Sequence, residues 1–288
     1  GVAAVRAIVG TRRTLAGRVA LRTAELVAGL AVLGAAALTA LATSAPLRAR
    51  TFASFYVSTI LRSTELDAIR CEDLGLSAIE GSVVEFGPGP ATNFRCWTSA
   101  TNISAWVGVE PNRNFEAAQT AEAQRFNLTF PRRTAWLRAE EEDDADAALD
   151  AVTPASFDNA VLTHVLCSVD DPRAVVRAAL RAVRPGGRVF FMEHVRAPHD
   201  ALATFVWSTR RIAQVALGPV FKILGNGCTF RDAAAILRRY DASASHDGDQ
   251  DGEHPEDDDV RRVAFDVFEG PFDAPVPLAV LKPHVIAR

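Results

Sequence analysis

Cysteine is scarce in this sequence of 288 residues, and the few cysteines follow no recognisable ligand spacing. Structural zinc sites and small disulfide-rich domains are recognised by closely spaced cysteines, often as C-x-x-C pairs. No such pair occurs, so we expect neither a zinc site nor a disulfide framework, and a reducing compartment is the default. We expect two of the cysteines to be small buried hydrophobic residues. These two are Cys167 and Cys228, and the others are Cys71 and Cys96.

Lysine is also rare, and the basic residues are unevenly distributed. Only 2 of the 31 basic residues are lysines, which we attribute to codon bias. Residues 1–50 carry seven arginines against the single acid Glu25, a net charge of +6, and because the whole chain carries −4 the other 238 residues carry −10. Nucleic-acid-binding domains present a dense basic face. The acidic body has none, which argues against general nucleic-acid binding.

Charge is absent from residues 26–47, a run of 22 residues. At about 1.5 Å per residue, a helix of this length crosses a bilayer core of roughly 30 Å. We predict a membrane anchor here, although the alanine-rich run also suits a buried or interfacial helix. Residues 1–24 contain arginines and no acid, as in organelle-targeting segments and basic membrane-surface helices. The expected location is an organellar membrane of a mitochondrion or plastid, with the endoplasmic reticulum as the alternative.

The remaining residues, 51–288, suit one α/β domain with appendages, because 49% hydrophobic content can fill a full core. Residues 51–80 have the periodicity of an amphipathic helix. The run 241–259 contains nine acids and is expected to be a disordered surface insertion. Its first part is similar to half of an EF-hand loop, but Asp258 stands at position twelve and Pro255 lies inside, so we expect no metal there.

The centre of the domain is a short apolar strand, Ser82–Phe86, that runs into Gly87-Pro-Gly-Pro90. Two glycines let the backbone approach a ligand closely, and a following helix would present free N–H groups to a nucleotide-type cofactor. The alternative is that this loop is an ordinary Gly-Pro turn that binds no ligand. The next predicted strand, 105–110, ends in Glu110, 23 residues after Gly87. An acid at that distance, at a strand end, typically holds a ribose.

The rest of the domain alternates helices with strands at spacings that predict a parallel sheet. A third strand is expected over 134–139, and Glu140 behind it is the candidate for the adenine amine. The further expected elements are helices over 115–126 and 171–183, strands over 157–166 and 188–195, and a turn at 185–187.

Seven short motifs follow in order: Glu85-Phe-Gly-Pro-Gly89, Val109-Glu-Pro-Asn112, Leu166-Cys-Ser-Val169, Arg184-Pro-Gly-Gly187, Phe191-Met-Glu-His-Val195, Gly225-Asn-Gly-Cys-Thr-Phe-Arg231 and Pro283-His284. As a set they resemble class I S-adenosylmethionine-dependent methyltransferases, and more narrowly the membrane-anchored thiol methyltransferases of the methyltransferase-like group. The resemblance covers about residues 50–288. This sequence departs from it at Pro90 and Ala91 in the glycine loop and in the acidic insertion.

The resemblance implies a doubly wound, Rossmann-like, mostly parallel sheet of seven strands with the last strand antiparallel. It also implies that S-adenosylmethionine lies across the ends of the first four strands, and that Glu193, His194 and residues 200–230 form the acceptor pocket. The cofactor-binding residues that it implies are Glu85, Gly87, Gly89, Asn93, Glu110, Asn112, Glu140, Thr163 and His164.

Methyl transfer from a sulfonium needs mainly alignment in a dry pocket, and a thiol acceptor is already partly ionised near neutral pH. His194 is the candidate base, because histidine titrates in this range and His194 ends a strand. Alternatively, Glu193 and His194 only bind neighbouring loops. We expect a methyltransferase for a small, lipophilic acceptor at a membrane. The competing expectation is a non-catalytic subunit of an organellar membrane protein complex.

Overall fold

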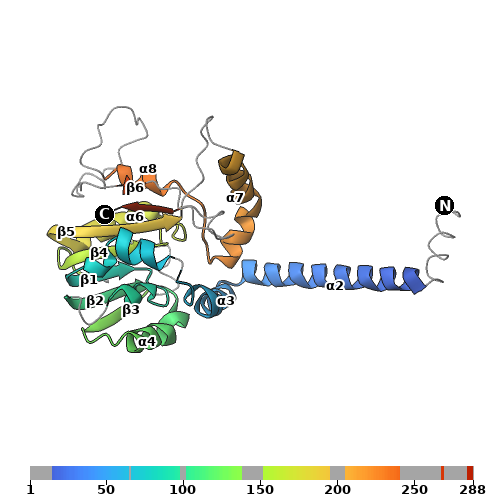
Figure 1. The fold of residues 1–288 in the computed structure, drawn as a ribbon, viewed down its shortest axis with the longest axis horizontal. Helices are drawn as coiled ribbons and strands as arrows, with labels where there is room; N and C mark the ends of the chain where they lie inside the picture. The colour runs from blue at the N-terminus through green and yellow to red at the C-terminus, as the bar shows by residue number, and fades with distance from the viewer. Residues whose placement is uncertain are drawn as a thin grey trace. The chain divides into compact units, whose positions relative to one another are not determined.

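The chain forms two compact units, residues 1–48 and residues 49–288, which are considered separately (Figure 1). The computed structural model describes residues 15–64, 66–97, 102–137, 152–194, 205–240, 267–268 and 284–287. The candidate Glu140 and the acidic run 241–259 lie outside these residues.

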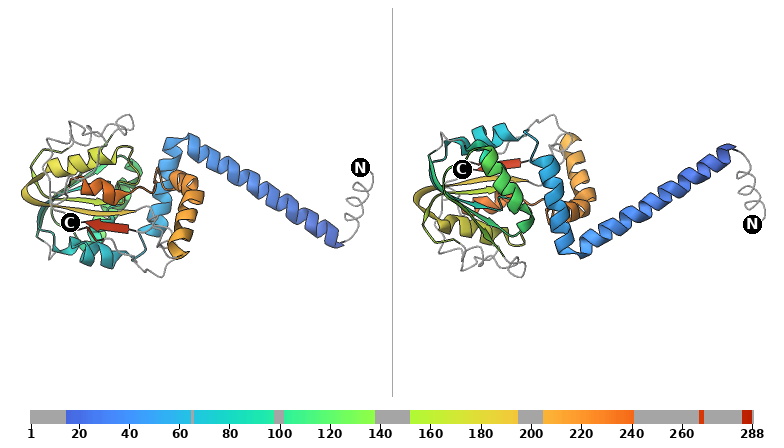
Figure 2. Two further views of the ribbon diagram at one scale, coloured as in Figure 1. Left: turned by 90° about the horizontal axis from the view of Figure 1, so that it is seen from above. Right: turned by 90° about the horizontal axis from the view of Figure 1, so that it is seen from below.

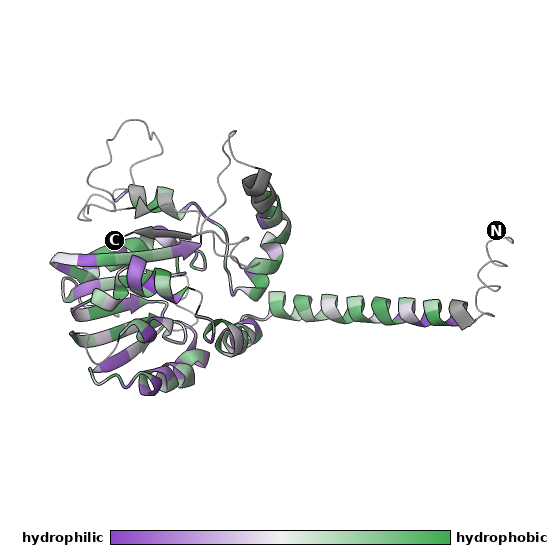
Figure 3. Ribbon diagram, in the orientation of Figure 1, coloured by the Kyte–Doolittle hydropathy of each residue, from purple (hydrophilic) through white to green (hydrophobic). Residues whose placement is uncertain are grey.

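The first unit is dominated by the helix α2 (Leu15–Thr43), whose side chains are mostly apolar (Figure 3). The stretch Arg18–Thr43 has a mean hydropathy of 2.1 and is long and apolar enough to cross a bilayer. Pro46 has no N–H to continue this helix, so α2 ends before Ser44 and a second helix, α3 (Ala45–Phe55), begins after it. Arg48 Nη1 donates to the carbonyls of Leu41 and Ala42 at 3.0 and 3.3 Å, which stabilises the end of α2.

In the second unit, five strands pair in parallel, as the alternating sequence pattern predicts. They occur in the order β3-β2-β1-β4-β5, and two short strands, β7 and β6, continue the sheet by antiparallel pairing beyond β5. The strands are β1 (Gly81–Phe86), β2 (Ile103–Glu110), β3 (Arg132–Trp136), β4 (Phe157–Thr163), β5 (Val183–His194), β6 (Val267–Phe268) and β7 (His284–Ala287).

Helices cover both faces of the sheet (Figure 2). Side chains alternate along each strand, so neighbours such as Val83 and Val84 enter different cores. The core with Val84 packs against α6 and α8, and the core with Val83 packs against α4 and residues 69–79. The described α-helices of this unit after α3 are α4 (Glu116–Arg125), α6 (Pro172–Ala182), α7 (Phe205–Leu224) and α8 (Ala233–Arg238).

Three local predictions need correction. The expected amphipathic helix over 51–80 is broken, because α3 ends at Phe55 and only π-helical turns (Tyr56–Ile60, Ile69–Asp73) and a short 3-10 turn (Leu76–Ala78) follow. The helix expected after the glycine loop is only a 3-10 turn, Thr92–Cys96. The turn expected at 185–187 does not precede the strand but lies within β5. The pairing of β5 with β4 is irregular there, because the register shifts between Phe157 and Asn159 of β4.

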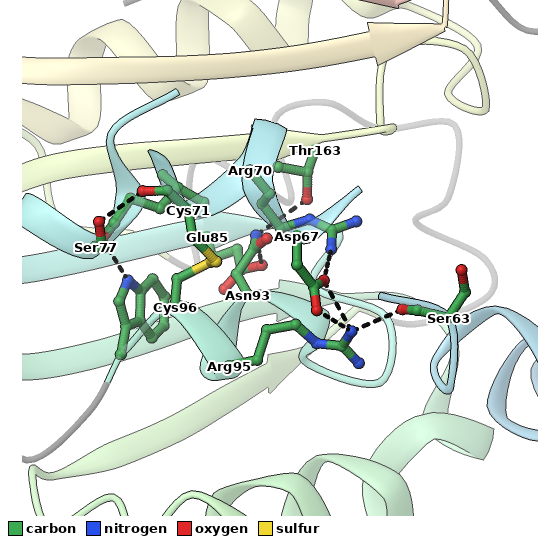
Figure 4. Close-up of a disulfide and its surroundings, with 12 residues drawn as sticks. Ser63, Asp67, Arg70, Cys71, Ser77, Glu85, Asn93, Arg95, Cys96 and Thr163 are labelled. Carbon is green, nitrogen blue, oxygen red and sulfur yellow. Dashed lines mark hydrogen bonds and ion pairs between the residues drawn. A yellow bond between two sulfur atoms is a disulfide. The ribbon is translucent and has the colours of Figure 1, made fainter. Parts of the chain in front are cut away.

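A disulfide joins Cys71 to Cys96, contrary to the expectation of free thiols throughout (Figure 4). The two cysteines are 25 residues apart and belong to the π-helical turn and the 3-10 turn, so their spacing in sequence gives no signal. Beside them Arg95 Nη1 contacts both carboxylate oxygens of Asp67 at 2.8 and 2.9 Å, and donates to the carbonyl of Ser63 at 2.8 Å. These contacts fasten residues 63–73 to the segment behind the glycine loop.

Replacing Cys71 and Cys96 together by alanine should lower the free energy of unfolding by roughly 3 to 4 kcal/mol, because a closed loop of 25 residues restricts the unfolded chain by about that amount. Urea unfolding measures this change. A phosphine reductant should destabilise the wild type and leave the double variant unaffected. An equal effect of the reductant on both proteins would contradict the disulfide.

Candidate active site at the carboxyl ends of the strands

The carboxyl ends of β1, β2, β4 and β5 meet at one edge of the sheet. The register brings Phe86 beside Val109 and Leu162, and Thr163 beside Met192. Residues that directly follow these positions are therefore neighbours, although they are up to a hundred residues apart in the chain. In open α/β sheets this edge is where ligands bind.

The glycine loop between β1 and the 3-10 turn has three residues in left-handed conformation, Gly87 (φ 58°), Gly89 (φ 55°) and Ala91 (φ 64°). A Cβ on Gly87 would lie 2.8 Å from Val165 Cγ2, so glycine is needed there for space and for conformation. A Cβ on Gly89 would meet nothing closer than the Phe115 ring at 3.9 Å. An added Cβ would therefore fit at Gly89 without a clash, but its φ means that alanine is strained there.

Glu110 lies directly against the glycine loop. Its Oε2 accepts a hydrogen bond from the Gly89 N–H at 2.8 Å, and its Oε1 accepts from the Asn112 N–H at 2.9 Å. The Asn112 side chain in turn donates to the carbonyl of Ala49 at 3.0 Å, which ties α3 to this edge. The glycine loop and Glu110, which the sequence spacing assigned to one cofactor site, are therefore in direct contact.

Glu85 is buried beneath the loop and is held by two donors. Asn93 Nδ2 donates to its Oε1 at 2.7 Å and Trp106 Nε1 donates to its Oε2 at 2.8 Å. Burial raises the pKa of Glu85 to about 7, although both donors and the nearby Arg70 favour the charged form. Asn93 Nδ2 also reaches Thr163 Oγ1 at 3.1 Å, so one amide links β1 to the end of β4 (Figure 4).

At the other end of the edge, His164 and His194 stack with ring centroids 4.1 Å apart and planes 9° apart. His194 Nδ1 lies 3.6 Å from Cys167 Sγ and 4.0 Å from Cys228 Sγ. Both cysteines are buried, as expected, but their meeting with His194 has no counterpart in the sequence spacing. Three separate segments supply these groups: the loop after β4, the end of β5 and the loop after α7.

Glu193 supports the loop that carries Cys167. Its Oε1 accepts hydrogen bonds from the N–H groups of Val165 and Leu166 at 2.8 and 3.0 Å. Burial raises the pKa of Glu193 to about 8, while the backbone donors favour its charged form. The structure thus shows Glu193 bound to a neighbouring loop, which was the alternative expectation for this residue.

A cavity of about 300 Å³ lies elsewhere, between α4 and strands β2 and β3. Trp106, Gln119 and Trp136 are among its lining residues, and none of the predicted site residues lines it. It lacks the glycine loop and the strand-end acids, so the sheet edge is the better candidate for the site.

Residues 61–222 match the sequence profile described as a methyltransferase domain, and the chain belongs to that family. It is 32% identical over 158 residues to thiol S-methyltransferase TMT1B of Rattus norvegicus, covering 54% of this chain and 57% of that protein. It is 31% identical over 160 residues to thiol S-methyltransferase TMT1A of Homo sapiens, covering 55% and 58%. The chain therefore spans little more than half the length of these curated relatives.

The fold is similar to that of a solved O-methyltransferase family protein from Burkholderia thailandensis, with a TM-score of 0.52 and 12% sequence identity. The match covers 82% of this chain and 59% of the other. At this identity the likeness concerns the fold alone, a Rossmann-like parallel sheet.

The residues at the sheet edge fit S-adenosylmethionine, the cofactor that this family implies. Gly87 and Gly89 provide a loop without side chains, and Glu110 stands beside it. Asn93 Oδ1 is buried and has no hydrogen-bond partner within the described residues, so it offers an acceptor to a ligand. An ionised carboxylate accepts about four hydrogen bonds, so Glu110 can bind ribose hydroxyls while it holds the loop.

The raised pKa of Glu85 predicts a pH-dependent stability. Because the folded protein keeps this proton up to about pH 7 and the unfolded chain releases it near pH 4.5, the wild type should lose stability as pH rises through this window. Relative to wild type, Glu85→Gln should gain about 2 to 3 kcal/mol between pH 4.5 and pH 8. Urea unfolding of both proteins across this range measures the difference. A difference that stays constant with pH would show that Glu85 is charged throughout.

Proposed function

We propose that this protein transfers a methyl group from S-adenosylmethionine to a small, lipophilic acceptor of the thiol type at a membrane. The observation that carries the proposal is the contact of Glu110 with the Gly89 N–H at the edge where His194 also lies. It unites the two elements that would hold the methionine and ribose parts of the cofactor. The thiol acceptor is supported by the names of the curated relatives, which are thiol S-methyltransferases.

In this proposal the residues divide into a cofactor half and an acceptor half. Gly87, Gly89 and Asn93 receive the methionine part, Glu110 and Asn112 the ribose side, Glu140 the adenine, and Thr163 and His164 form the floor. Glu85 acts by bracing Asn93 and Trp106.

The cofactor supplies an electrophilic methyl group on a sulfonium sulfur. The chain aligns the acceptor with it and excludes water, which accounts for most of the rate in such displacements. We propose His194 as the catalytic residue at the acceptor end, where its ring favours loss of the acceptor's proton. The stacked ring of His164 keeps it in place.

Membrane attachment through residues 1–50 is supported by the exposed apolar surface of α2. In the second unit, α7 also exposes apolar side chains, with Ile212 67% and Val215 70% exposed, and it leads directly into the loop that carries Cys228. An acceptor dissolved in the bilayer could thus reach the site along α7. Of the expected organelles, the Cys71–Cys96 disulfide favours the oxidising lumen of the endoplasmic reticulum.

We also propose that residues 51–288 form the catalytic domain, a seven-stranded class I sheet with β7 and β6 at its edge, and that residues 241–259 are an insertion in it. The accessory-subunit alternative lacks support of this kind, because the curated relatives are named as enzymes.

Two glycine variants separate cofactor binding from backbone strain. Gly89 and Gly186 both have positive φ, and an added Cβ would meet nothing closer than 3.9 Å at either position, but only Gly89 lies in the cofactor loop. Gly89→Ala and Gly186→Ala should each cost roughly 1 to 2 kcal/mol in the apo protein.

S-Adenosylmethionine at 100 times its dissociation constant should stabilise wild type and Gly186→Ala by about 2.7 kcal/mol, and should stabilise Gly89→Ala far less. Thermal melts with and without cofactor measure this. If wild type shows no stabilisation, the methyltransferase proposal fails, and if all three respond alike, the loop assignment fails.

Truncation tests the anchor. A chain starting at Ala45 keeps Ala49 and Phe52, which contact Asn112 and Phe115, so the domain should fold. The 288-residue chain expressed in cells should stay with membranes after a carbonate wash, whereas the truncated protein should be released. Retention of the truncated protein after the wash would refute residues 1–44 as the anchor.

A further inference from the structure

The two cysteines of the described chain that lie outside the disulfide meet one imidazole. Cys167 Sγ and Cys228 Sγ are 3.3 Å apart, and His194 Nδ1 faces both at 3.6 and 4.0 Å. Methyl transfer by alignment needs neither thiol. Filling space in the core also does not require two buried cysteines to lie beside a histidine nitrogen.

The spacing of these three atoms is close to that of ligands around a tetrahedral zinc ion. With Zn–S bonds of about 2.3 Å and Zn–N bonds of about 2.0 to 2.1 Å, tetrahedral geometry places two sulfurs about 3.8 Å apart and sulfur about 3.6 Å from nitrogen. The distances here are 3.3 Å for the sulfur pair, and 3.6 and 4.0 Å to nitrogen. Shifts of a few tenths of an ångström in the side chains suffice to close the site around an ion.

Hydrogen bonds fix both cysteine loops independently of any metal. The Thr229 N–H and Oγ1 donate to the carbonyl of Cys167 at 2.7 and 3.1 Å, which joins the two loops next to the sulfur atoms. Arg231 Nη2 donates to the carbonyl of Val169 at 2.6 Å, and Glu193 binds the N–H groups at the start of the Cys167 loop. Such support around the ligands is typical of metal sites.

We propose that Cys167, His194 and Cys228 bind one zinc ion and leave its fourth position for the sulfur of the methyl acceptor. Two thiolates with one imidazole are a donor set that zinc favours, and three protein ligands with one open position are the pattern of catalytic rather than structural zinc. The zinc site stands on the geometry alone, whereas its use by a thiol acceptor rests on the proposed function.

The bound ion gives the acceptor half a defined chemistry. On binding, the acceptor thiol releases its proton to solvent and is held as a thiolate. Its sulfur then forms a bond to the methyl carbon as the bond from that carbon to the sulfonium sulfur breaks, giving a thioether and S-adenosylhomocysteine with no change in oxidation state. His194 acts in this form as a ligand through Nδ1, and the ion takes the place of a free base in ionising the acceptor.

Metal binding is tested on the 288-residue chain in detergent and oxygen-free buffer, which keeps Cys167 and Cys228 reduced without opening the Cys71–Cys96 disulfide. After equilibration with Zn²⁺ and removal of excess ion, mass spectrometry of metals should find one equivalent in wild type. Cys167→Ala with Cys228→Ala, and separately His194→Gln, should weaken zinc binding by more than about 100-fold, beyond the 10- to 100-fold that loss of a mere supporting group costs. The matched control, Cys71→Ala with Cys96→Ala, removes two cysteines elsewhere and should keep one equivalent.

Substitution by Co²⁺ shows the ligands directly. Wild type should give the intense visible bands of tetrahedral cobalt and thiolate charge-transfer bands, and added 1-propanethiol should shift the latter by occupying the fourth position. Less than one tenth of an equivalent of zinc in reduced wild type, or equal binding by the Cys167/Cys228 variant, overturns the proposal, as does a Cys167–Cys228 disulfide that forms in the presence of zinc. If the charge-transfer bands do not change when 1-propanethiol is added, only the role in binding the acceptor is overturned. The thermal melts with and without cofactor test the methyltransferase proposal independently.

Discussion

Parallel pairing of β1, β2, β4 and β5 is the constraint on which the site depends, because it brings the carboxyl ends of all four strands to one edge. The glycine loop, Glu110, His164 and His194 each follow or end one of these strands. Their neighbourhood is thus a property of the sheet, while their fine placement comes from single hydrogen bonds such as that from the Gly89 N–H to Glu110. A change of register in any one strand would separate the two halves of the site.

Two buried carboxylates provide much of that fine placement. Glu85 joins Asn93 to Trp106 beneath the glycine loop, and Glu193 holds the backbone of the Cys167 loop. In both cases burial raises the pKa of the carboxyl group, while hydrogen bonds oppose that rise by favouring the charged form. Both carboxylates thus bind groups of the loops at this edge directly.

The sequence predicts the parts of this arrangement that depend on local pattern. Apolar runs with glycine turns predicted the strands, and the spacing from Gly87 predicted an acid at the end of the next strand, where Glu110 accepts from the Gly89 N–H. The prediction of a helix after the glycine loop was wrong. Ala91 adopts a left-handed conformation and Pro90 has no N–H, so only a 3-10 turn forms there. The roles predicted for single residues, including Glu140 outside the described chain, stay predictions.

Contacts between distant segments were beyond sequence pattern. The disulfide joins cysteines 25 residues apart, and Cys167, His194 and Cys228 are separated by 27 and 34 residues. Nothing in a single sequence distinguishes such pairs from cysteines that only fill space, since their approach is decided by how loops close over the sheet.

We infer that the cofactor lies between the glycine loop and the His194 end of the sheet. The most direct measurement is a crystal structure of the protein with bound S-adenosylhomocysteine. We expect ribose hydroxyls on Glu110, the methionine part over Gly87 and Gly89, and the thioether sulfur facing His194. Density for the ligand in the cavity between α4 and β3, with the glycine loop empty, would contradict it.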